Sequence, residues 1–473
     1  MNLYCHNSTR RHFLHDTAAG LGTLALADLL AADGRTMAAE AARCPSHHAS
    51  TAKNVIFLCM AGAPSQLDLF TPRPRLNALH GQPVPMSFLH DLDDALIRGS
   101  ARIFGSPRSF QRYGDCGMEF SDFLPHMAAC ADQFTMIRSM TTDISNHHPA
   151  QLLMNCGVPT FGLPSMGSWV TYGLGSESSS LPGFIVLLSR NGTGDLGGQD
   201  LWTNAFLPAN HRGVTFRADG DPILHLTSPG RMDLKTQQQR LRTILKMNRL
   251  RQKQHADPEI DSRIAAYELA FRMQTAAPEL VELSGESQHT LDAYGIGGVK
   301  TDAFGKNCLL ARRMIERGVR FVQLYHYTWD DHSDLNRKLK DNCERTEQGV
   351  AALIKDLDQR GLLDETLVVW GGEFGRTPMN EVRRGINPGK EGRDHHPFGF
   401  TMLMAGGGVR RGHIFGNTDD LGYHATENPV HIHDLQATIL HCLGLDHLQL
   451  TYRHKGRDFR LTDVAGEVIK DIL

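Results

Sequence analysis

The chain contains 473 residues, of which 41% are hydrophobic, 21% charged and 7% aromatic. This composition is typical of a globular protein with a large core and excludes a disordered chain. The formal net charge of −3 argues against nucleic acid as the main partner, because no excess of Lys and Arg is available to neutralise phosphates. Several of the 25 histidines lie close to Asp and Glu between residues 325 and 434, which favours a metal site.

The nine cysteines include no C-x-x-C pair, which argues against a four-cysteine zinc site and against a dense disulfide scaffold. Cys59 and Cys442 lie in apolar runs and are interpreted as small core residues. Beyond the N-terminal segment the sequence has no run of about 18 or more apolar residues, so no membrane span is expected in the mature chain.

The N-terminal segment has the features of an export signal. Residues 9–14, TRRHFL, form a twin-arginine pattern, and a small and apolar stretch follows over residues 18–32. The alternative interpretation is an ordinary amphipathic helix, because Asp16 and Asp28 lower the apolar character of this segment. We expect residues 1–50 to be a twin-arginine signal and linker that direct the protein to the periplasm or the cell surface.

Strand-like and helix-like patterns alternate along the rest of the chain. Apolar runs typical of buried parallel strands occur at residues 54–60, 134–140, 183–187, 319–325, 366–370 and 400–404. Helical patterns cover residues 122–130, 150–155, 234–275 with a break at Pro258, 302–317, 341–360 and 430–443. This order predicts an α/β fold with a mostly parallel sheet and helices on both faces. We expect residues 51–473 to form one domain, with a loop over 190–230 and a helical insertion over about 232–290.

Acids and histidines stand at the ends of several predicted strands, where an open α/β sheet presents its ligand edge. These residues are Asp68, Asp330 with His332, Glu373, and Asp394 with His395 and His396. The side chains of residues two apart in an extended segment point the same way, so Asp330 and His332 can bind one ion together. Mixed carboxylate and imidazole ligands suit Zn²⁺, Mn²⁺ or Fe, and a carboxylate-only subset suits Ca²⁺ or Mg²⁺. Each acid alone would be read as a strand-end or capping residue; together they favour a divalent metal.

A second group of polar residues precedes the helix predicted over 150–155. The segment TDISNH, residues 142–147, would place its side chains at a helix N-terminus, which favours an anionic substrate group or a developing oxyanion. Ser145 or Thr142 could serve as a nucleophile if a metal lowered its pKa, and Asn146 could hold the anion. The alternative is a plain helix cap. Arg376 could bind a substrate oxyanion or pair with a carboxylate.

Several segments resemble an exported bacterial family catalogued as domain of unknown function 1501. They are NVIFLCMAGAPSQLDLF, NHHPAQLLMNCG, WDDHSDL, GGEFGRTP, GRDHHPFGFTMLMAGGG and the ending LTYRHKGRDFRLTD. The resemblance covers nearly the whole chain. That family is similar to the alkaline phosphatase and sulfatase superfamily, so the resemblance implies an α/β core that carries metal.

The order of the superfamily's ligands can be carried onto this sequence. The Asp after the first strand matches Asp68, the segment with the nucleophile matches residues 142–147, and a later Asp/His pair matches Asp330 and His332. The superfamily's Asp-His-Gly matches residues 373–375, so Phe374 stands where a ligand is expected, and a further His matches His395 or His396. The sulfatase motif Cys-x-Pro-x-Arg does not occur in this chain.

The resemblance and the residues together predict an exported metal-dependent hydrolase of sulfate or phosphate esters. The expected cofactor is one or two divalent ions (Zn, Ca, Mg or Mn), and the expected partner is a small anionic, sulfated or phosphorylated substrate. The alternative is a degenerate, non-catalytic binding or scaffold protein of the cell surface, because Phe374 replaces a ligand and the sulfatase nucleophile motif is missing. The oligomeric state is left open.

Overall fold

A nine-stranded sheet forms the centre of the computed structural model, which describes residues 46–85, 101–189, 197–217, 222–223, 234–255, 258–381 and 389–473. In spatial order the strands are β12 (His413–Phe415), β4 (Phe134–Thr141), β11 (Phe400–Ala405), β8 (Thr366–Gly371), β1 (Asn54–Met60), β7 (Phe321–His326), β5 (Phe184–Leu188) and β6 (Val214–Phe216), with β15 (Val430–His431) also paired to β4. The signal and linker predicted within residues 1–50 lie, up to residue 45, outside the described residues.

The sheet is mostly parallel, as the sequence predicts. Strands β8, β1, β7, β5 and β6 pair in parallel, and β12 and β15 run parallel to β4. Only β11 within the described sheet runs against its two neighbours, β8 and β4. The six apolar runs recognised in the sequence are the six longest strands of this sheet, and β1 has the predicted bounds.

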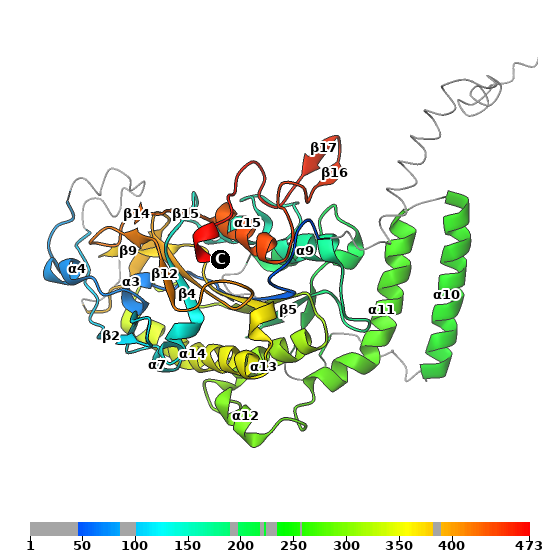
Figure 1. Ribbon diagram of the computed structural model, residues 1–473, viewed down its shortest axis with the longest axis horizontal. Coiled ribbons are helices and arrows are strands. Elements are labelled where there is room, and N and C mark those ends of the chain that lie inside the picture. Colours follow the sequence, from blue (N-terminus) through cyan, green and yellow to red (C-terminus); the bar gives the residue numbers. More distant parts are fainter. Residues whose placement is uncertain are drawn as a thin grey trace, which may run out of the picture. The chain divides into compact units, whose positions relative to one another are not determined.

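Helices cover both faces of the sheet, which confirms the predicted fold class (Figure 1). Side chains of β1 alternate between two cores: Ile56 and Leu58 belong to one cluster of buried residues, and Val55 and Phe57 belong to the other. The first core includes residues of α13 (Asp302–Glu316) and α14 (Leu335–Gln359). The second includes residues of α8 (His147–Cys156), α9 (Met166–Leu174) and α15 (Ile432–Cys442).

Several helix bounds differ from the prediction for identifiable reasons. Helix α8 begins at His147 rather than residue 150, because Pro149 lies in the first turn, where its missing N–H would have no helical partner. Helix α14 begins at Leu335 rather than residue 341, since Leu335 and Leu339 continue its buried side. The break predicted at Pro258 separates α10 (Leu234–His255) from α11 (Pro258–Val281), and α12 (Gln288–Ala293) follows.

Two regions predicted as loops contain strands. The segment after β8 folds back as a hairpin of β9 (Gly375–Asn380) and β10 (Arg393–His396), in which His395 pairs with Arg376. These short strands could not be recognised in the sequence, because they are polar and because Pro378 argues against a strand except at the edge of a sheet. Strand β6 lies in the predicted loop over 190–230 and is too short to show a periodic pattern; the rest of that loop lies partly outside the described residues.

The remaining elements are short and lie around this core. Among the described residues they are α3 (Gln66–Leu69), α4 (Pro74–Ala78), β2 (Phe110–Tyr113), β3 (Met118–Ser121), α7 (Pro125–Ala128), β13 (Asn417–Thr418), β14 (Ala425–Glu427), β16 (Tyr452–His454) and β17 (Arg457–Phe459), with five 3₁₀ turns. Among the described helices, none combines the length and the apolar character needed to cross a membrane.

Candidate functional site

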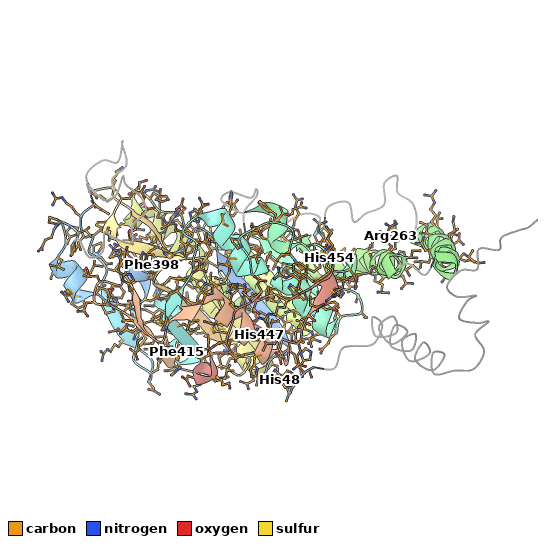
Figure 2. All side chains as sticks on the ribbon, turned by 90° about the horizontal axis from the view of Figure 1, so that it is seen from above. His48, Arg263, Phe398, Phe415, His447 and His454 are labelled. Carbon is orange, nitrogen blue, oxygen red and sulfur yellow. The ribbon has the colours of Figure 1, made fainter. Side chains whose placement is uncertain are left out.

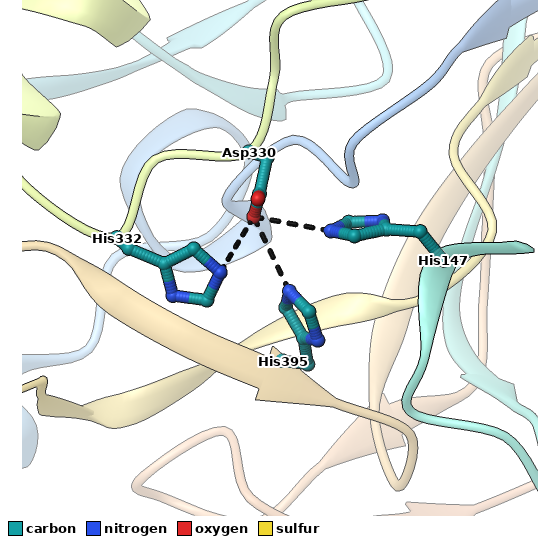
Figure 3. Close-up of side chains that lie close together, drawn as sticks. All are labelled: His147, Asp330, His332 and His395. Atoms are coloured by element: carbon teal, nitrogen blue, oxygen red, sulfur yellow. Dashed lines mark hydrogen bonds and ion pairs between the residues drawn. The ribbon is translucent and has the colours of Figure 1, made fainter. Parts of the chain in front are cut away.

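Three histidines and one aspartate converge on a single point (Figure 3). The Nε2 atoms of His147, His332 and His395 lie 3.1, 2.9 and 3.2 Å from Oδ1 of Asp330. One nitrogen or oxygen from each of the four side chains lies within 4.8 Å of every other. All four side chains are half-buried, so the point is enclosed by protein and still reachable from solvent.

The four residues come from three distant parts of the fold. His147 is the first residue of α8, Asp330 and His332 follow β7 at the centre of the sheet, and His395 lies in β10. The turn after β1 approaches the backbone of Asp330 closely. Gly62 has φ +102°, and a Cβ atom there would lie 2.6 Å from the Asp330 nitrogen. Glycine at this turn therefore allows β1 and the loop after β7 to meet.

Each histidine is oriented by a partner on its other ring nitrogen. Nδ1 of His147 contacts Glu373 Oε1 at 2.7 Å, Nδ1 of His332 contacts Glu381, and Nδ1 of His395 contacts the backbone oxygen of Ser145 at 2.6 Å. A carbonyl or an ionised carboxylate only accepts hydrogen bonds, so each Nδ1 is the donor. This arrangement leaves all three Nε2 atoms facing Asp330, as in metal sites whose histidines are held by carboxylates.

The residues present fit a divalent cation. The Nε2 atom of His147 is buried and makes no hydrogen bond, although it lies beside Asp330. A neutral imidazole with its proton on Nδ1 directs a lone pair from Nε2, and a lone pair facing a carboxylate oxygen is repulsive unless positive charge lies between them. Three imidazole nitrogens and one carboxylate oxygen are a donor set that suits Zn²⁺ first and Mn²⁺ or Fe²⁺ next.

The carboxylates of the cluster shift the pKa values of the histidines beside them. Burial lowers the pKa of His147, but its interactions with Asp330 and Glu373 outweigh burial and raise that pKa to about 9. Burial likewise lowers the pKa of His332, and Asp330 and Glu381 raise it overall. Burial raises the pKa of Asp330, but the three histidines and Arg376 hold it well below its usual value. A cation at this point would compete with the proton of His147.

Arg376 supports Asp330 from inside the protein. Its guanidinium is fully buried, and Nη2 lies 2.7 Å from Asp330 Oδ1. Its other N–H groups donate to backbone oxygens, including those of Ala63 at 3.0 Å and Arg393 at 3.1 Å. From the sequence, Arg376 could either bind a substrate oxyanion or pair with a carboxylate. In the structure it pairs with the carboxylate of Asp330.

Asp68 lies apart from the cluster, in a buried ion pair. Its Oδ2 atom is 2.8 Å from Nε of Arg393, and its Oδ1 atom is 3.3 Å from Nη2 of the same side chain. Ser65 donates a hydrogen bond to the same carboxylate at 2.5 Å. Burial raises the pKa of Asp68, but Arg393 and these hydrogen bonds lower it overall. The Arg393 guanidinium thus supplies a positive charge beside Asp68.

Two other predicted metal ligands contact the outer sides of the histidines. Glu373 is fully buried behind His147 and accepts hydrogen bonds from the Gly62 backbone at 3.0 Å and from Gln151 at 3.1 Å. An oxygen of Asp394 lies 3.7 Å from Nδ1 of His332. His332, Glu381 and Asp394 also lie close enough to hold an ion, but Nδ1 of His332 already donates to Glu381.

The candidate nucleophiles lie in the segment that enters α8. Ser145 and Asn146 are exposed, and Asn146 is the capping residue of α8, although its side chain makes no capping hydrogen bond. Thr142 is buried, and its backbone N–H donates to Pro397 at 3.0 Å. The backbone oxygen of Ser145 accepts a hydrogen bond from His395, which ties this segment to the cluster.

Phe374 packs against the histidines. Its ring centroid lies 4.9 Å from that of His147 and 4.7 Å from that of His395, and its side chain is buried. The residue that replaces an expected ligand thus fixes the rings of two members of the cluster. His396, the second candidate at that position, is buried elsewhere and donates from Nε2 to the backbone oxygen of Tyr423.

Asp330, His332 and His395 were predicted as ligands from the sequence, whereas His147 was predicted only as part of the segment that enters a helix. Its place in the cluster follows from α8 beginning three residues earlier than the pattern indicated. Glu381 was missed because it follows β9, a strand that the sequence did not reveal.

Solved structures to which the chain is similar include a sulfatase, a phosphatase and a lipoteichoic acid synthase. PsFucS1 sulfatase from Pseudoalteromonas sp. is 11% identical, with a TM-score of 0.35 over 83% of this chain and 68% of that one. TAB5 alkaline phosphatase is 11% identical, with a TM-score of 0.33 over 84% and 99%. The synthase LtaP from Listeria monocytogenes is 9% identical, with a TM-score of 0.36 over 88% and 76%.

A search of the curated proteins gave no match. One family of sequences matches residues 52–473, which is nearly the whole chain and includes every residue of the cluster. The chain belongs to this family, whose description is "Protein of unknown function (DUF1501)".

Proposed function

We propose that the protein is a metal-dependent hydrolase of sulfate or phosphate esters, with one divalent ion held by His147, Asp330, His332 and His395. One observation carries this proposal: three Nε2 atoms face one carboxylate oxygen, and each histidine is held by a separate partner on Nδ1. A structural role for a single histidine would not require this shared orientation. Zn²⁺ is the first candidate, because three of the four ligands are imidazoles.

A cation at this point would supply Lewis-acid polarisation of an ester oxygen. The protein's own groups would hold and attack the substrate. Ser145 is the preferred nucleophile, since it is exposed beside the cluster, whereas Thr142 is buried. The first turn of α8 has free N–H groups and the positive end of the helix dipole, so it would bind the anionic part of the ester together with Asn146. Arg376 would act as a positioning residue, because it holds Asp330 and is closed to solvent.

The proposal is tested by metal analysis together with activity on aryl sulfates and aryl phosphates. We expect one equivalent of metal per chain and measurable hydrolysis, both lost in Asp330→Ala and His332→Ala. The matched control is His148→Ala, which removes an exposed histidine next to His147 that does not belong to the cluster. A purified protein that binds no divalent ion would refute the proposal.

A second candidate function is binding without catalysis. Phe374 packs against His147 and His395, and Asp68 is paired with Arg393, so neither position supplies a ligand to a second cation. On this alternative the protein would bind metal and an anionic ligand but turn over no ester. Stoichiometric metal with equal, background-level hydrolysis in the parent and in Asp330→Ala would favour it.

We also propose export by the twin-arginine route, which rests on the sequence TRRHFL at residues 9–14. Replacing Arg10 and Arg11 together with Lys should retain the protein in the cytoplasm, as measured by cell fractionation. The same distribution for parent and variant would contradict this route.

A further inference from the structure

Helix α10 has an unusual charge for this chain. Its 22 residues include seven Lys or Arg and no Asp or Glu: Lys235, Arg240, Arg242, Lys246, Arg249, Arg251 and Lys253. The neighbouring α11 carries four acidic and two basic residues, and the whole chain has a net charge of −3. Helix α10 therefore carries a local excess of positive charge in a chain whose net charge is negative.

The same helix exposes large apolar side chains. Ile244, Met247 and Leu250 are 41%, 63% and 57% exposed. They are spaced three residues apart, so they lie close together along one side of the helix. Leu245 is 8% exposed and faces the other way, toward the side on which α10 packs along α11. The two helices lie side by side in both views, with Arg263 marking α11 in Figure 2.

Basic side chains lie next to these apolar side chains. Arg240 and Lys246 are exposed. On a helical projection Lys246 lies beside Leu250, and Arg240 lies in line with Met247 and Ile244, about two turns closer to the start of the helix than Met247. Arg240, Arg242 and Lys246 make no ion pair with any residue that the structure describes, whereas exposed Lys53 lies 2.7 Å from Glu365. These cations are available to a negatively charged partner.

We propose that α10 binds the protein to the surface of an anionic lipid bilayer. A basic helix with exposed apolar side chains beside its charges is suited to lie in the headgroup region, with the cations on lipid phosphates and the apolar groups in the acyl boundary. A free polyanion such as a sulfated polysaccharide would use the charges but would leave Met247 and Leu250 in water. A second copy of the same helix would place seven positive charges against seven more.

The proposal is independent of the ester hydrolase function and is tested with the full-length protein after signal removal. Co-sedimentation is measured with vesicles of phosphatidylcholine alone and with vesicles of phosphatidylcholine and phosphatidylglycerol in equal parts. We expect binding to the anionic vesicles only, weakening as salt is added, because the charges are screened. Equal binding to both vesicle types, or to neither, would refute the proposal.

Two double variants separate the charge from the apolar side chains. Arg240→Gln with Lys246→Gln, and Met247→Gln with Leu250→Gln, should each weaken vesicle binding by roughly tenfold or more. The matched control, Arg453→Gln with Arg457→Gln, removes the same charge from exposed positions on β16 and β17 and should leave binding unchanged. Unchanged thermal midpoints show that the variants are folded.

The outcome also decides between a bilayer and a soluble polyanion. If the Met247/Leu250 variant bound vesicles like the parent while only the charge variant and added heparin reduced binding, the surface would be a polyanion site and the bilayer proposal would be wrong. Equal weakening in the Arg453/Arg457 control would also overturn it, because net charge rather than α10 would then be responsible.

Discussion

Nδ1 of His147 lies 2.7 Å from Oε1 of Glu373, and this contact decides which nitrogen of His147 faces Asp330. Glu373 is buried and is itself fixed by Gly62 and Gln151, so the orientation of the imidazole is set by three separate elements. A ligand held in this way loses little freedom when an ion binds.

Glu373→Gln should weaken metal binding by about 10- to 100-fold, because a neutral amide makes the imidazole a poorer electron donor while keeping its shape. Competition with a chromophoric chelator measures the affinity. Glu365→Gln is the control, since Glu365 is exposed and pairs only with Lys53 among the described residues. Equal affinities in the parent and in Glu373→Gln would show that Glu373 does not support the site.

Removal of the metal should lower the thermal midpoint of the parent protein. An ion that binds only the folded state adds about 2.7 kcal/mol to the free energy of unfolding at a hundredfold excess over its dissociation constant. Calorimetry with and without a chelator measures the change. In His332→Ala the chelator should have no effect, while His148→Ala should respond as the parent does.

Ser145→Ala should reduce kcat by about 10³-fold or more while leaving the bound metal in place. The substitution removes only the hydroxyl, because His395 is held by the backbone oxygen of Ser145, which alanine retains. Turnover and metal content are measured on the same preparation. If Thr142→Ala loses turnover and Ser145→Ala does not, the nucleophile is Thr142.

Arg393→Met should destabilise the fold by about 3–5 kcal/mol, because it leaves the carboxylate of Asp68 buried without its partner. Urea unfolding measures this loss. The matched variant Arg393→Met with Asp68→Leu removes both charges and should recover much of the stability. If the double variant were less stable than Arg393→Met, the ion pair would not be the cause.

Low pH should weaken the ion pair between Asp68 and Arg393. The folded-state pKa of Asp68 is lowered, so its contribution to stability is complete above the unfolded pKa of about 3.9 and disappears as the pH falls through the folded value. The free energy of unfolding of the parent should therefore fall more steeply below about pH 4 than that of Asp68→Asn. Parallel curves for the two proteins would mean that the carboxylate does not carry this dependence.

The fold was predictable because its central strands are buried on both faces and appear as continuous apolar runs. The hairpin of β9 and β10 was not, since short polar strands at an edge have no such pattern and Pro378 argues against one. Some features of the site were likewise predictable and others were not. Asp330 and His332 both follow a predicted strand, whereas the contact of Glu381 with His332 depends on the hairpin register, which no local pattern encodes.

The convergence on Asp330 has a mechanical consequence. An ion bound there would join the start of α8, the loop after β7 and the hairpin of β10, which lie far apart along the chain. Such an ion acts as a crosslink that closes two long loops, and the chain entropy it removes grows with loop length. The metal would then keep the hairpin fastened to the sheet, so that the loaded protein resists unfolding and proteolysis as one unit.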